Sequence, residues 1–147
     1  MIPITLSTVA AHCCGRLIVG DGGLVISNVS TDSRKAGKGD LFVALHGERF
    51  DAHDYLGEVG KAGVAAVIVH RLPAGWQNLG CSIIEVPDTL RGLQKLAHEH
   101  RLLARPFVVG ITGSNGKTST KEFTSAVLSK KKNVCATTGN LNNHIGV

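Results

Sequence analysis

The feature that most constrains the fold is a glycine-rich turn between two apolar segments of different period. Residues 107–112 form a continuous apolar run and predict a strand. Residues 117–129 have helical spacing and predict a helix that turns Phe123, Ala126 and Val127 inward. A strand, a glycine loop and a helix in this order are the parts of a phosphate-binding loop. They predict an α/β fold with a parallel sheet.

The residues of this loop suit the polyphosphate of a nucleotide. Gly113 and Gly116 allow backbone angles that let successive N–H groups face one anion, and the helix start adds the positive end of its dipole. Lys117 is placed to reach the terminal phosphates as the catalytic cation, and the Thr118 hydroxyl to bind Mg²⁺. We expect ATP to contact Thr112, Gly113, Ser114, Asn115, Gly116, Lys117, Thr118 and Ser119.

The loop departs from the general pattern at one position. The pattern has a glycine five residues before Gly116, where this chain has Ile111, and glycines stand instead at positions 110 and 113. An ordinary glycine-rich turn between a strand and a helix is the alternative interpretation, which the Gly-Lys-Thr triplet disfavours.

The rest of the chain predicts a small α/β domain over residues 1–104, followed by a boundary near residues 104–106. We expect helices at residues 7–14, capped by Ser7, at 54–62, and from Pro87-Asp88 to about 104. Strands are expected at 16–19 and 24–29, joined by a glycine turn, and at 41–45, 65–69 and 82–86. With a last strand at 133–137, residues 105–147 supply only the first β-loop-α-β of a Rossmann-like P-loop ATPase domain. We therefore expect a piece of a longer protein, because such a sheet needs more chain.

Composition argues against several classes of function. The net charge is +5, but apart from the lysines at 130–132 the basic residues are scattered and not interleaved with aromatics, so no nucleic-acid partner is expected. No segment has the length of a membrane span, and the first residues do not form a signal peptide. The four cysteines form no C-x-x-C pair and predict reduced packing residues in a cytoplasmic protein that does not insert into membranes.

Three stretches together resemble the Mur ligases. Thr112-Gly113-x-x-Gly116-Lys117-Thr118 is similar to the ATP loop of Mur ligases and folylpolyglutamate synthetases. Residues 39–45 (GDLFVAL) and 47–54 (GERFDAHD) resemble a first-domain signature of the family, and residues 139–147 (GNLNNHIGV) resemble the segment after the second strand of its ATPase domain. The resemblance extends from about Leu6 to the last residue.

This resemblance implies an activity and a substrate site. The activity is ATP-dependent addition of D-alanyl-D-alanine to UDP-N-acetylmuramoyl-tripeptide in peptidoglycan precursor synthesis, through an acyl phosphate, with ATP and Mg²⁺ and with the protein as a monomer. Residues 1–104 would then hold the UDP-sugar. The implied substrate residues are Thr31, Asp32, Ser33 and Arg34 on one loop, Glu48, Arg49 and Phe50 on the facing loop, and Asn140 and Asn143 near the phosphates.

Other interpretations stay open at this point. Asp32 and Ser33 can form a simple Asx turn with Arg34 as a surface cation, and the two asparagines can be turn formers. A sibling ligase that adds the third amino acid shares the loop and the 39–45 strand, while a non-catalytic module for nucleotide or UDP-sugar needs only binding. An unrelated P-loop NTPase would leave the first domain unexplained. In the family, the acidic Mg²⁺ ligand, a modified lysine and the third domain follow the position of Val147, so we expect the 147-residue chain alone not to ligate.

Overall fold

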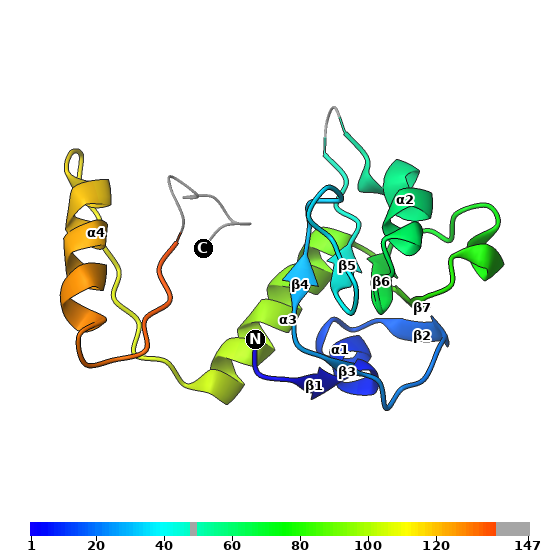
Figure 1. Cartoon of the computed structure of the whole chain (residues 1–147), viewed down its shortest axis with the longest axis horizontal. Helices are drawn as coiled ribbons and strands as arrows, with labels where there is room; N and C mark the ends of the chain where they lie inside the picture. The colour runs from blue at the N-terminus through cyan, green and yellow to red at the C-terminus, as the bar shows by residue number, and fades with distance from the viewer. Residues whose placement is uncertain (48–49, 138–147) are drawn as a thin grey trace. The chain divides into compact units, whose positions relative to one another are not determined.

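The structure, a computed structural model, describes residues 1–47 and 50–137. It divides into two compact units, Met1–Arg105 and Pro106–Val147 (Figure 1). The first unit contains both β-sheets and the helices that cover them. The second contributes one long helix and the glycine loop before it.

A five-stranded sheet forms the centre of the first unit. Its order is β2 (Arg16–Val19), β7 (Ser82–Glu85), β6 (Ala66–Val69), β5 (Leu41–Val43) and β4 (Val29–Ser30). The strands β4, β5, β6 and β7 run parallel, and β2 is antiparallel to β7. The carboxyl ends of the four parallel strands therefore meet at one edge of the sheet, where α/β proteins bind their ligands.

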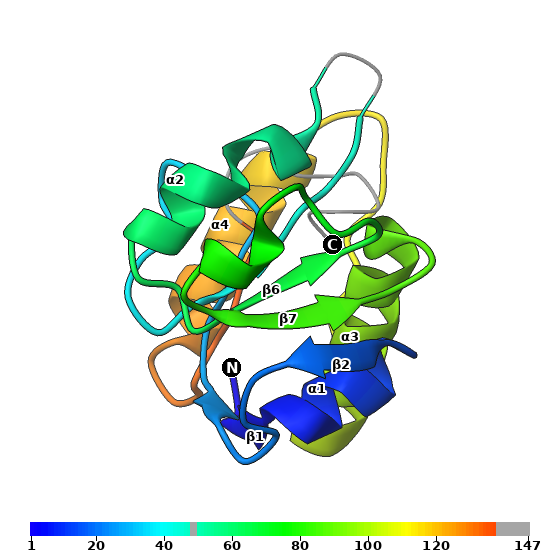
Figure 2. The ribbon, with the colours of Figure 1, turned by 90° about the vertical axis from the view of Figure 1, so that its right-hand side faces the viewer.

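Helices cover both faces of this sheet, because alternate strand residues point to opposite sides (Figure 2). Leu41 and Val43 pack with α1 (Leu6–His12) and α3 (Thr89–Ala104), whereas Phe42 packs with the 3₁₀ helix η1 (Ala52–Tyr55) and α2 (Leu56–Lys61). All four residues of β6 are fully buried, which explains why its sequence is continuously apolar rather than alternating. The fold is thus a three-layer α/β/α arrangement, and the predicted α/β class is confirmed.

Local signals predict some helix ends correctly and others incorrectly. The carboxylate of Asp88 accepts a hydrogen bond from the backbone N–H of Arg91 at 2.9 Å and starts α3, as the Pro87-Asp88 signal predicts. The expected Ser7 cap of the first helix is wrong. Thr5 holds that position and its hydroxyl accepts from the Thr8 N–H at 3.3 Å, so α1 begins at Leu6.

The strand expected at residues 24–29 is two strands with different partners. β3 (Val25–Ile26) pairs antiparallel with β1 (Ile4–Thr5) in a separate two-stranded sheet, and β4 joins the main sheet beside β5. The helix expected at 54–62 begins earlier, as the single turn η1, and continues as α2. A further short 3₁₀ helix, η2 (Trp76–Asn78), lies between β6 and β7.

The second unit contains α4 (Lys117–Leu128) but no strand among its residues up to 137. The strands expected at 107–112 and 133–137 are absent there, because a strand needs a hydrogen-bonded neighbour and none is present in the part described. The predicted inward face of the helix is also wrong. Phe123 is 73% exposed and Val127 71% exposed, and Ala126 is exposed as well.

Two negative findings concern the described part of the chain. None of its helices combines the length and apolar character that crossing a bilayer requires. All four cysteines are free thiols, but only Cys13 is buried, and Cys14 and Cys135 are exposed rather than packed.

Candidate functional site

Three loops gather at the carboxyl edge of the parallel sheet. β4 leads into residues 31–34, β5 into residues 44–51, and β6 into His70 and Arg71. Because β4, β5 and β6 are adjacent and parallel, the two loops that the sequence singles out emerge on the same side of the sheet. The loop after β6 joins them there, and it was not among the predicted site residues.

The first of these loops is a tight turn built around Asp32. Its carboxylate accepts from the Arg34 backbone N–H at 3.1 Å, which is an Asx turn, and from the Arg34 guanidinium at 2.9 and 2.8 Å. The hydrogen bonds from Arg34 lower the pKa of Asp32 to about 2, and Asp32 in turn raises the pKa of Arg34. Arg34 is 85% exposed and Thr31 is exposed, whereas Ser33 is half-buried. The turn thus holds a guanidinium in a fixed orientation at the surface.

The second loop is closed at its base by backbone contacts. His46 and Asp51 form an antiparallel bridge, and the Gly47 N–H donates to the Phe50 carbonyl at 2.8 Å. The Phe50 ring is stacked on Tyr55, with ring centroids 5.0 Å apart, yet remains 54% exposed. Glu48 and Arg49, predicted as substrate residues, lie outside the described residues.

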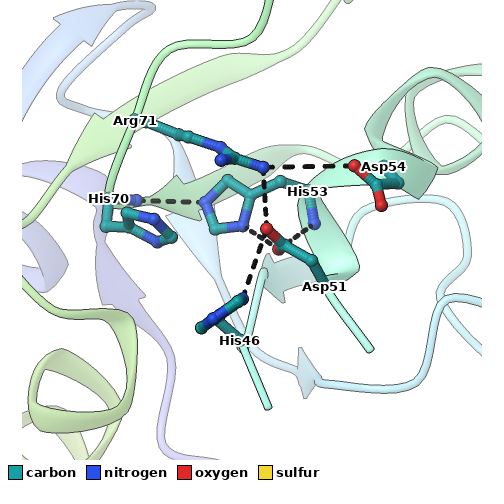
Figure 3. A network of polar contacts seen from close by, with 6 residues as sticks. All are labelled: His46, Asp51, His53, Asp54, His70 and Arg71. Carbon is teal, nitrogen blue, oxygen red and sulfur yellow. Dashed lines mark hydrogen bonds and ion pairs between the residues drawn. The ribbon is translucent and has the colours of Figure 1, made fainter. Parts of the chain in front are cut away.

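A polar cluster that the sequence did not predict joins the second loop to the end of β6 (Figure 3). One oxygen of the Asp51 carboxylate accepts from the His53 backbone N–H at 2.9 Å and faces His53 Nδ1 at 2.7 Å. The other oxygen accepts from Arg71 at 2.7 Å and lies 3.3 Å from His46 Nδ1. We call Asp51, His53, His46, His70 and Arg71 the Asp51 cluster.

The hydrogen bonds of the cluster fix the tautomer of His53. The His70 backbone N–H donates to His53 Nε2 at 3.2 Å, so this nitrogen carries no proton. The proton is therefore on Nδ1 and is donated to Asp51. Burial, the largest influence, lowers the pKa of His53, because only 2% of its side chain is exposed. A neutral imidazole is thus held between two fixed partners.

The Asp51 carboxylate is ionised within this cluster. Burial, its largest single influence, acts to raise the pKa, but the hydrogen bonds from His53 and the charge of Arg71 together lower it to about 2. Among the described residues, no set of three or more His, Cys, Asp or Glu side chains has the arrangement of a metal site.

One signal in the sequence points to the cluster. Asp51 and His53 follow one apolar strand, and His70-Arg71 directly follow another. Placing both strand ends at one edge of a parallel sheet would have brought these polar residues together.

The glycine loop of the second unit has the backbone that its sequence requires. Gly113 has φ 145° and Gly116 has φ 75°, conformations that other residues adopt rarely. Gly116 is the N-cap of α4 and offers no side chain to the first amides of the helix. The Lys117 ammonium donates to the Gly113 carbonyl at 2.5 Å and to the Ser114 carbonyl at 3.4 Å, and so lies over the loop.

The other expected residues of the second unit are placed as follows. Thr112, Asn115, Thr118 and Ser119 are exposed in or beside this loop. Asn140 and Asn143 lie outside the described residues. The structure therefore gathers the expected nucleotide residues in one loop, and their contacts with ATP stay a prediction.

Family models match both units of the chain. The model described as "Mur ligase family, catalytic domain" matches residues 25–101, and the one described as "Mur ligase middle domain" matches residues 111–147. The first match alone spans more than half of the chain and covers the candidate site at the sheet edge.

Individual relatives agree with these models. The chain is 46% identical over 124 residues to the UDP-N-acetylmuramoyl-tripeptide–D-alanyl-D-alanine ligase of Bacillus subtilis, covering 84% of this chain and 27% of the relative. It is 43% identical over 147 residues to the enzyme of the same name from Escherichia coli, covering 100% of this chain and 31% of the relative. The chain thus spans less than a third of the length of either relative.

Solved structures give the same assignment. A crystal structure of MurF from Acinetobacter baumannii has a TM-score of 0.85 and 36% identity, over 98% of this chain and 31% of that one. The structure of MurF ligase from Thermotoga maritima in complex with ADP has a TM-score of 0.67 and 37% identity, over 81% and 27% of the two chains. On these grounds the chain belongs to the Mur ligase family and is homologous to the amino-terminal part of MurF.

Proposed function

We propose that the chain is the amino-terminal part of an ATP-dependent ligase that joins D-alanyl-D-alanine to UDP-N-acetylmuramoyl-tripeptide. The observation that carries the proposal is the 43% identity over all 147 residues to an enzyme of that name. The polar loops at the carboxyl edge of the sheet and the glycine loop before α4 support it from the geometry. Since ATP is a nucleotide and the tripeptide substrate would be linked to UDP, we infer that the enzyme works in the cytoplasm.

The UDP-sugar would bind at the sheet edge of the first unit. Asp32 occupies two of the five N–H groups of Arg34, so the other three are left for phosphate oxygens. The Thr31 hydroxyl lies on the same turn and suits a ribose or uracil oxygen. The exposed ring of Phe50 suits contact with the planar base or the sugar.

The glycine loop of the second unit suits the phosphates of ATP. A side chain built on Gly116 would meet nothing within 4 Å, so there is space beside the residue that precedes α4. The amides there and the Lys117 ammonium would bind the β- and γ-phosphates, and the Thr118 hydroxyl would hold Mg²⁺.

The reaction would then proceed in two steps. The tripeptide carboxylate attacks the γ-phosphorus of ATP, so ADP leaves and an acyl phosphate forms. The amine of D-alanyl-D-alanine attacks the acyl carbon, the C–O bond to phosphate breaks, and the amine loses a proton. Lys117 would stabilise the negative charge that develops on the transferred group. Mg²⁺ would neutralise charge on the β- and γ-oxygens.

A chimera tests this function directly. Residues 1–147 replace the matching segment of the Escherichia coli enzyme, and phosphate release is measured with ATP, UDP-N-acetylmuramoyl-tripeptide and D-alanyl-D-alanine. We expect release that requires all three substrates, is lost with Lys117→Ala, and is retained with the exposed control Lys130→Ala. The unjoined 147-residue chain is expected to release none.

The outcome that contradicts the proposal is equally specific. A folded chimera that binds Mg-ATP but releases no phosphate with all three substrates, or releases it equally well without D-alanyl-D-alanine, would refute it. Preference for diaminopimelate with the corresponding shorter precursor would assign the chain to the sibling ligase that adds the third amino acid.

A further inference from the structure

His53 stands out because it is buried at the edge of the candidate substrate site without facing it. Its side chain is 2% exposed, whereas its neighbours Arg71 and His46 are 58% and 63% exposed. The ring donates to Asp51 and accepts from the His70 N–H, so both its nitrogens are occupied by protein partners. A group with both nitrogens occupied cannot bind substrate, but it can hold the groups that do.

Two candidate ligand-binding groups depend on this arrangement. The Arg71 guanidinium is oriented by Asp51 at 2.7 Å, and Asp51 is oriented by two hydrogen bonds from His53. Phe50 is the residue directly before Asp51, and Tyr55, on which its ring stacks, lies in η1 with His53. A shift of His53 would therefore move the exposed ring and the exposed guanidinium together.

We propose that His53 is a positioning residue of the substrate site, whose neutral ring ties Asp51 to the end of β6 and so fixes Phe50 and Arg71 for the UDP-sugar. The inference rests on the proposed function, because it takes the sheet edge to be the UDP-sugar site. His53 itself touches no substrate.

Proton addition would break this arrangement. A protonated His53 would present an N–H from Nε2 to the His70 N–H, and two donors cannot bond to each other. The charged or titratable groups around it are Asp51, His70 and Arg71. His46 contacts the second oxygen of the Asp51 carboxylate, and the Asp54 carboxylate lies 4.0 Å from the Arg71 guanidinium. Ligand affinity should therefore fall on acidification.

Three variants of His53 separate its two bonds. His53→Asn retains an N–H donor near the position of Nδ1 and loses the acceptor for His70. His53→Gln retains an acceptor near the position of Nε2 and loses the donor to Asp51. His53→Ala loses both, and His98→Gln, an exposed change on α3, is the matched control. Binding of UDP-N-acetylmuramoyl-tripeptide to the 147-residue chain is measured by calorimetry between about pH 7.5 and pH 5.5.

We expect His53→Ala and His53→Gln to weaken binding about tenfold or more at neutral pH, the effect of roughly one lost hydrogen bond. His53→Asn lacks the bond to His70 at every pH, so at neutral pH it should bind about as weakly as the acidified parent. It should also lose the fall on acidification that the parent and His98→Gln show. If all three variants fold and their affinity and pH profile are unchanged, the inference about His53 is wrong, while the proposed function still stands. No binding by the parent chain would overturn the proposed function, and the inference with it.

A second measurement needs no variant and therefore tests the inference even if the variants fail to fold. In the parent chain, NMR follows the His53 ring nitrogens and the ring protons of Phe50 and Tyr55 as the pH is lowered. We expect the proton on Nδ1 at neutral pH and a joint shift of the two aromatic rings when His53 is protonated. Aromatic signals that do not respond to that protonation would overturn the inference.

Discussion

Replacing Asp51 by alanine should destabilise the first unit far more than replacing its neighbour Asp54. Asp51→Ala removes the acceptor of a His53 N–H in a place where only 2% of the histidine side chain is exposed. An unsatisfied buried donor costs about 1–3 kcal/mol. Asp51 also caps η1 through the His53 backbone N–H, and losing a cap costs about 1 kcal/mol.

The remaining contacts of Asp51 add little to this sum. Arg71 and His46 are more than half exposed, and ion pairs at such positions contribute about 0–1 kcal/mol. We therefore expect Asp51→Ala to lower the free energy of unfolding by about 2–4 kcal/mol. Asp54 is 72% exposed with its carboxylate 4.0 Å from Arg71, so Asp54→Ala should cost less than about 1 kcal/mol.

Urea unfolding followed by tryptophan fluorescence measures the free energy of unfolding of the first structural unit in both variants. The single tryptophan, Trp76, packs against the core on the α2 face of the sheet and therefore reports the first unit. The free energy is taken from the transition midpoint and slope. If Asp51→Ala proves no more destabilising than Asp54→Ala, the account of the Asp51 cluster is wrong.

Alanine substitution at the two glycines of α2 should change the stability in opposite directions. At Gly60 the added methyl group would lie 2.7 Å from the Leu79 carbonyl oxygen, whereas at Gly57 it would meet nothing within 4 Å. Urea titration should show Gly60→Ala destabilised by about 1–3 kcal/mol and Gly57→Ala stabilised by about 0.5–1 kcal/mol, and the reverse order would refute the packing. Burial lowers the pKa of His53 from its ordinary 6.5, so its stabilising contribution is complete above pH 6.5 and decreases as the pH falls toward the lower folded-state pKa. Thermal melts from neutral to mildly acidic pH should show a melting temperature that falls with pH in the parent and falls less in His53→Asn. An equal fall in both proteins would contradict the assignment of this pH dependence to His53. Arg34→Ala should weaken UDP-sugar binding about tenfold in calorimetry, and an unchanged affinity would remove this residue from the site.

The central layers of the fold follow from local patterns in the sequence. The apolar run that becomes β6 is buried on both faces, and Asp88 caps α3 as its position before a helical pattern predicts. Pairing partners depend on contacts between distant segments, which periodicity does not report. The segment at residues 24–29 accordingly divides between two sheets, and Thr5 rather than Ser7 caps α1.

The parts of the candidate site that lie in a sequence motif could be predicted. The part that forms only when distant strands pair could not. The glycine loop before α4 and the turn at Asp32 lie in recognisable motifs, and the turn is indeed an Asx turn. The Asp51 cluster has no motif, because its members come together only when β5 and β6 lie side by side. Phe123 and Val127 were expected inside from their helical spacing, but that spacing does not say whether a partner surface is present.

Mapping of UDP-N-acetylmuramoyl-tripeptide on the isotopically labelled chain by NMR tests the central claim most directly. We predict amide shifts concentrated at Thr31 to Arg34, at Phe50 and at Arg71, which together mark the carboxyl edge of the parallel sheet. Saturable shifts confined to α1 and α3, or no shifts at ligand concentrations up to the millimolar range, would contradict it.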